Sequence, residues 1–420
     1  MRTKAVRMYG KGDLRLEDFE LPAIAPGEIL AEVVSDSLCM STWKAAQQGM
    51  DHKRVPKDIA DNPVIMGHEF CGRILEVGEE WKDHFFPGQK YTIQPALNYK
   101  GSLDAPGYSY RYIGGNATHI IIPREVMELG CLLPYEGDAY FYGSLAEPMS
   151  CIVGAYHAMY HTEYAVYQHN MGIREGGSMA LLAAAGPMGL GAIDYALHCP
   201  RRPARLVVTD INTQRLARAA SVYPAEEAQK QGVELHYVNT AELADPVAAL
   251  RALAGGEGFD DVIAFAPVDV VVEQADAILG YNGCLNFFAG PNNKDFQAKV
   301  NFYNIHYSFT HVMGTTGGNT DDMREALQMM GEGRINPAGM LTHIGGLDAA
   351  AQATLNLPSI PGGKKLIYAQ VALPLTAIDD FRAFGSSDPF FAGLADIVDS
   401  NGGIWCAQAE EYLLRNAKPI

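Results

Sequence analysis

Hydrophobic positions in residues 1–155 occur in short runs that glycine, proline and aspartate separate. The runs include "EILAEVVSDSL", "GRILEVG", "QKYTIQP" and "ATHIIIP". Short runs that are rich in β-branched residues and bounded by turn residues are typical of antiparallel strands. We therefore expect a barrel-like first domain, which opens with a strand over Ala5–Tyr9 and a turn from Gly10 to Gly12.

The pattern changes at Ser178, where wholly apolar runs begin to alternate with helical ones. Strands are predicted at "SMALLAAA", "ARLVVTD", "FDDVIAFAP" and "GCLNFFAG", and helices at "PMGLGAIDYALHC", "NTQRLARAASVY" and "VVVEQADAIL". This alternation predicts βαβ units and a parallel sheet, so the fold class is α/β. We place the second domain at residues 156–317.

Residues 318–420 are expected to return to the first domain. A helix is predicted at "TDDMREALQMMGEG", and its cap is Asn319 with the aspartates that follow. Strands are predicted at "MLTHIGGL" and "KKLIYAQV". From Ala377 onward the pattern indicates helices, in which Trp405 and Tyr412 are available for packing.

Composition and charge narrow the class of protein. The chain has 420 residues, of which 48% are hydrophobic and 19% charged, and its net charge is −17. That charge disfavours nonspecific binding to nucleic acid or an anionic membrane. No apolar run reaches the ~18 residues of a membrane span, and the N-terminus does not resemble a secretory signal. The seven scattered cysteines suggest no disulfide framework, so we expect a cytoplasmic protein.

A glycine turn follows the first predicted parallel strand and has the features of a dinucleotide site. It reads Ala184-Ala185-Gly186-Pro187-Met188-Gly189, which approximates G-x-G-x-x-G with alanine at the first position. Such a turn lets a pyrophosphate approach the backbone at a helix N-terminus. The alternative is an ordinary turn of a βαβ unit.

An acidic residue ends the next predicted strand. Asp210 lies where a carboxylate binds the ribose hydroxyls of NAD and would repel the 2′-phosphate of NADP. Arg215 lies about one helical turn further on and would counter that repulsion in part. We expect NAD(H) as the cofactor and NADP(H) as a less favoured one.

Three residues far apart in the sequence are possible ligands of a catalytic zinc ion. His68 lies in "NPVIMGHEFCG", Cys39 at the end of an apolar strand, and Glu147 at the start of a predicted helix. Cysteine, histidine and carboxylate all bind zinc, and three protein ligands with an open position describe a catalytic site. A structural role for His68 is the alternative, since spacing alone does not bring these residues together.

The order and spacing of these features resemble the zinc-dependent medium-chain dehydrogenase/reductase family over nearly the whole chain. The matching features are Cys39, the triplet Gly67-His68-Glu69, Glu147-Pro148, the glycine turn and Asp210. The resemblance is greatest to the polyol branch, in which a glutamate is the third zinc ligand. Within that branch, "SLCMSTWK", "DHKRVP", "GHEFCG", "GCLNFFAGP" and "GGNTDDMREAL" are similar to ketose 1-phosphate reductases.

The resemblance implies a GroES-like β-barrel catalytic domain and a Rossmann cofactor domain. It implies that Cys39, His68 and Glu147 bind one catalytic zinc ion and that Glu69 is a nearby carboxylate. It also implies that Ser41 hydrogen-bonds the reacting alcohol and passes its proton. Ser41 as a strand-end hydroxyl and Glu69 as a structural residue are the alternatives.

The sequence departs from the family in two places. The segment from Gln94 to Gly115, where many members bind a structural zinc ion through four cysteines, contains none, so four tyrosines and turn residues must hold this lobe. Thr42 and Lys44 stand where the family commonly has an aspartate and often a histidine. Lys44 would replace the histidine as a proton relay or bind an anion.

Other basic residues are candidates for binding a substrate phosphate. Lys53 and Arg54 follow His52 in a locally basic stretch, for which a solvated surface cluster is the alternative. The pair Lys364-Lys365 is a less favoured candidate. His119 is expected to be a strand residue and not a ligand.

The expected function is zinc- and NAD(H)-dependent reduction of a ketose 1-phosphate to a hexitol phosphate. One alternative is the same chemistry on an unphosphorylated polyol or secondary alcohol, and a second is a nicotinamide-binding protein without turnover. The resemblance suggests a homodimer or homotetramer that is joined through the cofactor domains, with the edge strand near "FTHVMGT".

Overall fold

The computed structural model describes residues 1–420, which form two compact units. Unit 1 comprises Met1–Glu147, Asn319–Gly331 and Leu341–Ile420, and unit 2 comprises Pro148–Gly318 and Glu332–Met340. The division falls inside helix α3 (Tyr140–Ala158), immediately after Glu147. The returning segment therefore contributes to both units, whereas the sequence placed all of it with the first domain.

Unit 1 is built mainly on antiparallel strands, as the sequence predicted, although β17 and β18 pair in parallel. An eight-stranded sheet has the order β20-β17-β18-β3-β5-β6-β8, with β7 also paired to β3, and a three-stranded sheet has the order β2-β1-β4. The strands of these sheets are β1 (Arg2–Gly10), β2 (Asp13–Glu20), β3 (Ile29–Ser37), β4 (Val64–Ile65), β5 (Phe70–Val77), β6 (Lys90–Ile93), β7 (His119–Ile122), β8 (Leu132–Pro134), β17 (Leu341–Gly346), β18 (Lys364–Tyr368) and β20 (Thr376–Ala377). The short strands β19 (Val371–Ala372) and β21 (Lys418–Pro419) pair with each other.

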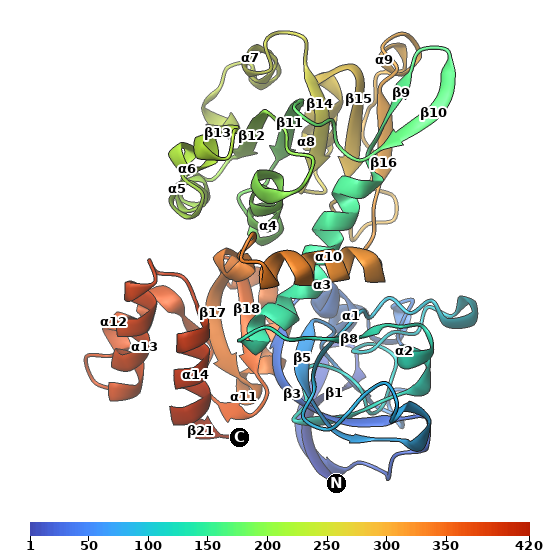
Figure 1. Ribbon diagram of the computed structural model, residues 1–420, viewed down its shortest axis with the longest axis vertical. Helices are drawn as coiled ribbons and strands as arrows, with labels where there is room; N and C mark the ends of the chain where they lie inside the picture. The colour runs from blue at the N-terminus through green and yellow to red at the C-terminus, as the bar shows by residue number, and fades with distance from the viewer. The chain divides into compact units, whose positions relative to one another are not determined.

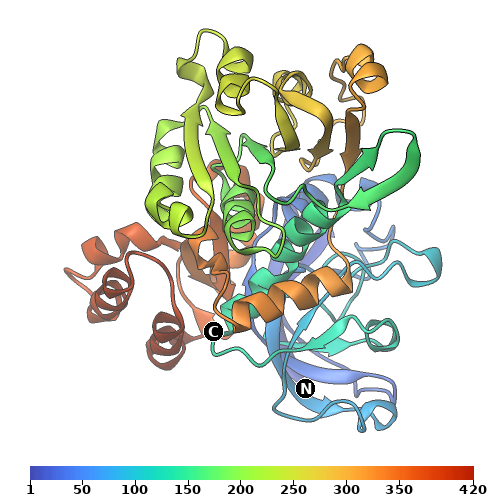
Figure 2. The same cartoon turned by 45° about the horizontal axis from the view of Figure 1, so that its top comes forward.

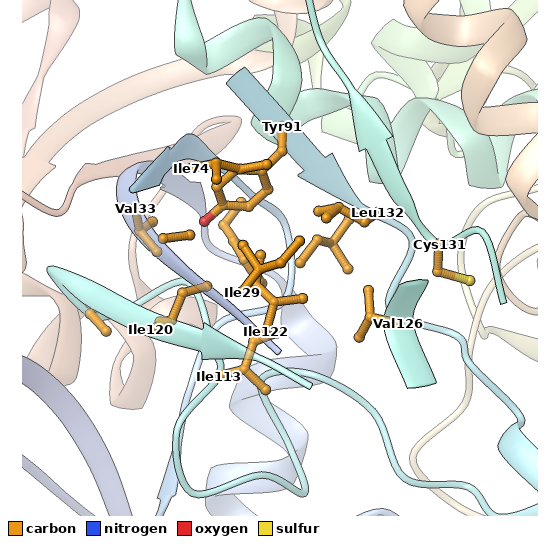
Figure 3. Packing of buried hydrophobic residues seen from close by; sticks show 14 of the residues in the cluster. Ile29, Val33, Ile74, Tyr91, Ile113, Ile120, Ile122, Val126, Cys131 and Leu132 are labelled. Atoms are coloured by element: carbon orange, nitrogen blue, oxygen red, sulfur yellow. The ribbon is translucent and has the colours of Figure 1, made fainter. Parts of the chain in front are cut away.

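Apolar side chains from five strands of the large sheet, β3, β5, β6, β7 and β8, contribute to the main core of unit 1. Ile29 and Val33 of β3, Ile74 of β5, Tyr91 of β6 and Ile120 of β7 are buried and point toward one another (Figure 3). Burial of each large side chain of this kind contributes roughly 1.5–3 kcal/mol. Most residues of β3, β6 and β7 are buried, so these strands are covered on both faces.

The cysteine-free lobe is attached to this core by packing. Leu97 and Ile113 are buried members of the core, and Tyr99 and Tyr110 pack against it. The lobe's other two tyrosines, Tyr108 and Tyr112, pack in separate apolar clusters of unit 1. Apolar and aromatic side chains thus hold a lobe that four cysteines hold in many relatives.

Unit 2 is a doubly wound sheet, so the Rossmann expectation is confirmed. Its six strands are parallel and have the order β13-β12-β11-β14-β15-β16, which places the first strand in the middle as in dinucleotide-binding domains. The strands are β11 (Ser178–Leu182), β12 (Arg205–Asp210), β13 (Glu234–Asn239), β14 (Phe259–Ala264), β15 (Leu279–Phe287) and β16 (His311–Gly314). The edge strand expected near "FTHVMGT" is β16.

The helices follow the sequence pattern where that pattern was long and amphipathic. Unit 1 contains α1 (Met40–Gln48), α2 (Arg124–Glu128), α10 (Thr320–Gly331), α11 (Leu347–Leu355), α12 (Phe381–Phe384), α13 (Pro389–Ser400) and α14 (Ala407–Asn416). Unit 2 contains α4 (Pro187–His198), α5 (Thr213–Val222), α6 (Ala225–Lys230), α7 (Pro246–Leu253), α8 (Asp269–Ala277) and α9 (Phe302–Tyr307). None of the helices is both long and apolar enough to cross a membrane.

Asn319 caps α10, as predicted. Its side-chain oxygen accepts hydrogen bonds from the backbone N–H groups of Asp321 and Asp322, at 2.8 and 2.9 Å. The Asp322 carboxylate in turn accepts from the backbone N–H of Asn319 at 2.9 Å. The reciprocal pair satisfies donors that a helix start leaves without intrahelical partners.

A hairpin of unit 2 was not predicted from the sequence. Strands β9 (Tyr160–Glu163) and β10 (Val166–Met171) form a separate two-stranded sheet beside the parallel one (Figures 1 and 2). His161 fastens the hairpin to the sheet, because one ring nitrogen lies 3.1 Å from the Asp261 carboxylate and the other 2.9 Å from the Asn282 carbonyl oxygen.

The C-terminal helices bind the start of α3 through a buried carboxylate. Glu410 of α14 accepts hydrogen bonds from the backbone N–H groups of Tyr140 and Phe141, at 2.6 and 2.9 Å. Glu410 also accepts a hydrogen bond from the Tyr368 hydroxyl at 2.9 Å. The oxygen of that hydroxyl in turn accepts a hydrogen bond from the Trp405 indole N–H. Trp405 is fully buried, as expected for a packing residue. The extension thereby fixes the helix that carries Glu147.

Glu410 gives the stability of the protein a specific pH dependence. Burial raises the pKa of Glu410 from 4.5 to about 7, although its three hydrogen bonds favour the carboxylate. Between these values the folded state binds the extra proton, so stability falls as pH rises. The full change amounts to roughly 3 kcal/mol at ~1.36 kcal/mol per pH unit.

We predict that thermal melts of Glu410→Gln lose most of the decline in Tm that the unsubstituted protein shows between pH 5 and pH 8. The matched control is Glu411→Gln on the exposed side of the same helix, which should retain the decline. Equal declines in the unsubstituted protein and Glu410→Gln would contradict this assignment.

Candidate active site

Cys39, His68 and Glu69 meet in unit 1 although they come from separate segments. Cys39 follows β3 and is the N-cap of α1, and His68 and Glu69 directly precede β5. Their ligating atoms all lie within 4.8 Å of one another. Gly67 permits this turn, since its φ is +91° and a Cβ there would lie 2.6 Å from the Asp36 carboxylate.

The hydroxyls of α1 orient the imidazole of His68. Thr42 Oγ1 lies 3.0 Å from Nδ1, and Ser41 Oγ lies 3.3 Å from Nε2. Burial first, then the charges of Lys364 and Arg54, lower the pKa of His68 to about 4 despite the opposing effect of Glu69. If Nδ1–H donates to Thr42, neutral Nε2 directs its lone pair at the cluster, as a metal ligand requires.

Cys39 is half-buried and lies among carboxylates. Burial and then the Glu69 carboxylate raise the pKa of Cys39 to about 12, and Glu147 raises this pKa further. A thiolate at this position therefore needs a nearby cation, and a divalent metal ion supplies one. The donor types and their burial fit a zinc ion.

The two glutamates of the predicted site are in different situations. Glu69 Oε2 accepts hydrogen bonds from the Ser37 hydroxyl and the Lys364 ammonium group. Glu147 lies on α3 outside the group of atoms within 4.8 Å, but its charge acts on Cys39. The ligating atoms of Cys39, His68 and Glu69 therefore lie closer to one another than those of the predicted ligands Cys39, His68 and Glu147.

The idea that Lys364 and Lys365 bind a substrate phosphate is wrong. The Lys364 side chain is 5% exposed and pairs with Glu69. Burial alone would lower the pKa of Lys364, but the charges of Glu69 and Cys39 outweigh it and raise this pKa. Lys365 is also buried and donates to the carbonyl oxygens of Pro361 and Gly363, at 2.8 and 2.6 Å.

The other basic candidates gather around His52. The His52 ring stacks on Tyr108 with centroids 5.8 Å apart, and the Arg54 guanidinium carbon lies 5.9 Å from the Tyr108 ring centroid. Burial and then the charges of Arg54, Lys53 and Lys44 lower the pKa of His52 to about 4. The three cations are thus close enough to act on one imidazole.

Two residues near the zinc candidates were not assigned a role from the sequence. Thr42, noted only as a departure from the family, contacts Nδ1 of His68. Tyr108 was counted only among the lobe tyrosines, yet its hydroxyl donates to Ser41 Oγ at 2.9 Å. Both contacts cross large separations in the sequence, so no local pattern indicates them. His119, in contrast, lies on β7 as expected.

The glycine turn of unit 2 has the geometry that a pyrophosphate needs. Gly186 is the N-cap of α4, offers no capping side chain, and has open space where a Cβ would lie. A Cβ on Gly189 would lie 1.8 Å from the Ala184 carbonyl oxygen, so close packing of helix and strand requires glycine there. Pro187 is the first residue of α4 and Met188 the second. These features fit a dinucleotide.

Asp210 ends β12 next to this turn. Its Oδ2 accepts from the backbone N–H of Ala185 at 3.3 Å, and its Oδ1 accepts from those of Ile211 and Asn212, at 2.8 and 3.0 Å. Arg215 lies on α5 and is exposed. The carboxylate is therefore held at the carboxyl end of β12, where dinucleotide-binding folds place a ribose.

Comparisons with known proteins decide the family. Residues 25–132 match the alcohol dehydrogenase GroES-like domain, and residues 187–332 match the zinc-binding dehydrogenase domain. The chain belongs to the zinc-binding alcohol dehydrogenases. The resemblance to zinc-dependent medium-chain dehydrogenases of the polyol branch and the GroES-like and Rossmann fold are thereby confirmed.

Relatives with high identity cover almost the whole chain. Mannitol-1-phosphate 5-dehydrogenase of Aliivibrio fischeri is 54% identical over 98% of this chain and 97% of its own length. L-sorbose 1-phosphate reductase of Klebsiella pneumoniae is 51% identical over 100% of this chain and 98% of its own length. The structure of 2R,3R-butanediol dehydrogenase from Bacillus subtilis has a TM-score of 0.70 at 20% identity, and it covers 87% of this chain and 99% of its own.

Membership in the family makes the protein a zinc-dependent dehydrogenase or reductase that acts on CH–OH groups. The alternative of a nicotinamide-binding protein without turnover therefore has no support. The assignments of individual site residues stay predictions, and they define the first test.

We predict one tightly bound zinc ion per chain, because one ligand cluster is assembled and the lobe lacks cysteines. Elemental analysis of the purified protein measures this, and two tightly bound zinc ions would contradict it. Cys39→Ser should lose zinc and activity but keep its Tm within a few degrees, since a catalytic zinc ion contributes less to folding than a structural one. Cys406→Ser, at the N-cap of α14, is the matched control and should keep both zinc and activity.

Proposed function

We propose that the protein is a zinc- and NAD(H)-dependent reductase that interconverts a ketose 1-phosphate, such as L-sorbose 1-phosphate, with a hexitol phosphate. The observation that carries the proposal is the cluster of Lys44, Lys53 and Arg54 around His52. The His52 ring stacks on Tyr108, whose hydroxyl contacts Ser41. In a chain of net charge −17, three cations in one place are suited to a phosphate. Two close relatives bear names that refer to sugar phosphates.

The residues divide the chemistry among them. Cys39, His68 and Glu147 would hold the zinc ion, which supplies Lewis-acid polarisation of the substrate oxygen. Ser41 Oγ would donate its proton to that oxygen during reduction and accept it during oxidation. Lys44, five residues after Cys39, would either relay this proton or bind the phosphate.

Unit 2 would bind the cofactor. Gly186, Pro187 and Met188 would present the start of α4 to the pyrophosphate, while Gly189 keeps helix and strand close. Asp210 would accept hydrogen bonds from the ribose hydroxyls of NAD(H), which supplies or accepts the hydride.

We also expect a cytoplasmic homodimer or homotetramer. None of the seven cysteines forms a disulfide, which suits a reducing compartment. Strand β16 leaves one edge of the parallel sheet open, and Tyr281, Tyr303 and Val312 of unit 2 are exposed. An open edge with exposed apolar residues is suited to association with a second copy. Sedimentation as a monomer would contradict this expectation.

We predict that alanine at Lys44, Lys53 or Arg54 raises KM for L-sorbose 1-phosphate by roughly ten- to a hundredfold, the ~1.5–3 kcal/mol of a charge-assisted hydrogen bond. KM for unphosphorylated L-sorbose should hardly change, because only the phosphate makes the contact. Steady-state kinetics with both sugars measures the difference. Lys57→Ala, a nearby exposed lysine, is the matched control.

Two results would change the interpretation. Loss of turnover on both sugars in Lys44→Ala alone would make Lys44 a proton relay. If none of the three substitutions has an effect and the unsubstituted enzyme does not prefer the phosphorylated sugar, the substrate is an unphosphorylated polyol or secondary alcohol.

We predict that NADH is preferred over NADPH in kcat/KM and that Asp210→Ala reduces the preference, because the carboxylate repels a 2′-phosphate. Arg215→Ala is the matched comparison, and it should increase the preference by removing the nearest compensating charge. Better turnover of the unsubstituted enzyme with NADPH would show that Arg215 or another basic residue outweighs Asp210.

A further inference from the structure

Tyr108 reaches from the cysteine-free lobe into the candidate active site. Its side chain is buried, its hydroxyl donates to Ser41 Oγ at 2.9 Å, and the same oxygen lies 3.3 Å from His68 Nε2. The Tyr108 and His68 ring centroids are 4.8 Å apart. The lobe thus contributes a polar group to the reaction site.

A second glycine makes this approach possible. Gly107 has a φ of +79°, and a Cβ there would lie 2.0 Å from the Gly67 carbonyl oxygen. The lobe therefore contacts the backbone immediately before His68, with no room for a side chain between them. This close contact places Tyr108 beside Ser41.

The ring of Tyr108 also contacts the basic cluster. The His52 ring is nearly parallel to it, with an angle of 11° between the planes, and the Arg54 guanidinium group lies near its face. Arg54 is further held by a hydrogen bond of 2.8 Å to the Leu103 carbonyl oxygen, also in the lobe. Tyr108 thus contacts both the Ser41 hydroxyl, to which proton transfer is assigned, and Arg54, one of the residues offered for the phosphate.

We propose that Tyr108 is a positioning residue that aligns Ser41 for proton transfer and sets the spacing between Ser41 and the phosphate-binding cations. A serine hydroxyl has one hydrogen to donate and two lone pairs. When the Tyr108 hydroxyl occupies one lone pair, the Ser41 hydroxyl loses rotational freedom. Its hydrogen and its other lone pair then face its remaining neighbours, among them His68 Nε2. The second part of the proposal, on spacing, rests on the proposed function.

Two substitutions separate the alignment of Ser41 by the Tyr108 hydroxyl from the spacing set by the Tyr108 ring. Tyr108→Phe keeps the ring and removes the hydroxyl, so kcat should fall roughly tenfold while KM for L-sorbose 1-phosphate stays within about twofold, as expected for one lost hydrogen bond. Tyr108→Leu also removes the stacked ring, so KM for the phosphorylated sugar should rise as well, with KM for L-sorbose unchanged. Tyr112→Phe, in the same lobe but a different apolar cluster, is the matched control and should leave both constants unchanged.

A double-mutant cycle tests whether Tyr108 acts through Ser41. If it does, Ser41→Ala combined with Tyr108→Phe should have the same kcat as Ser41→Ala alone. Independent, multiplicative losses would overturn the proposal, as would an unchanged kcat in Tyr108→Phe. Zinc content and Tm of each variant are measured alongside, and loss of zinc in Tyr108→Phe would make the tyrosine part of the metal site and overturn the proposal.

The cycle also separates this proposal from the proposed function. Any sugar or polyol that the enzyme turns over reports the coupling between Ser41 and Tyr108. If the enzyme does not prefer phosphorylated sugars, the spacing role fails with the proposed function, while the coupling still decides the alignment role.

Discussion

The candidate site of unit 1 depends on compensating the buried carboxylate of Glu69 with one buried cation. Asp36, Cys39, Glu69 and Glu147 supply potential negative charge around the zinc candidates, and burial with the nearby Glu69 raises the pKa of Asp36 well above its usual range. Lys364 is the buried ammonium group that pairs with Glu69. An unpaired buried carboxylate would cost several kcal/mol, so burial of Glu69 requires this lysine.

The chain must return from its C-terminal part to supply that cation. Lys364 begins β18, which pairs antiparallel with β3, so that Leu366 lies opposite Ser37. Cys39 follows β3 directly, and Ser37 itself donates to Glu69. The discontinuous sequence of unit 1 thus has an electrostatic consequence, because the N-terminal segment alone would leave Glu69 buried without its partner.

A feature could be predicted from the sequence when the residues that form it lie close together in the chain. Strands β11, β12, β14 and β15 and helices α4, α5 and α8 of unit 2 are evident because their apolar pattern repeats within a few residues, whereas β13, α6, α7 and α9 were not predicted. Roles for Cys39 and His68 could be suggested because the type of each residue, and its place in the order of the family's motifs, can be read directly from the sequence. The pairing of Lys364 with Glu69 and the contact of Tyr108 with Ser41 join distant segments, and neither residue lies in a pattern that indicates its partner. Strand β10 was missed because every one of its residues is exposed, which leaves no alternation to detect.

Electrostatics also separates the roles of the aromatic and charged groups near Ser41. Because the pKa of His52 is lowered to about 4, its imidazole is neutral at physiological pH and acts as a flat surface that stacks on Tyr108. The positive charges that act on this stack therefore belong to Lys44, Lys53 and Arg54, the residues proposed to bind the phosphate. Long-range repulsion by a net charge of −17 is screened beyond about 10 Å at 0.1 M salt, whereas contacts at hydrogen-bond distance are not. A protein of this charge can accordingly bind a phosphate, provided that the lobe and its tyrosine keep these cations next to the reaction site.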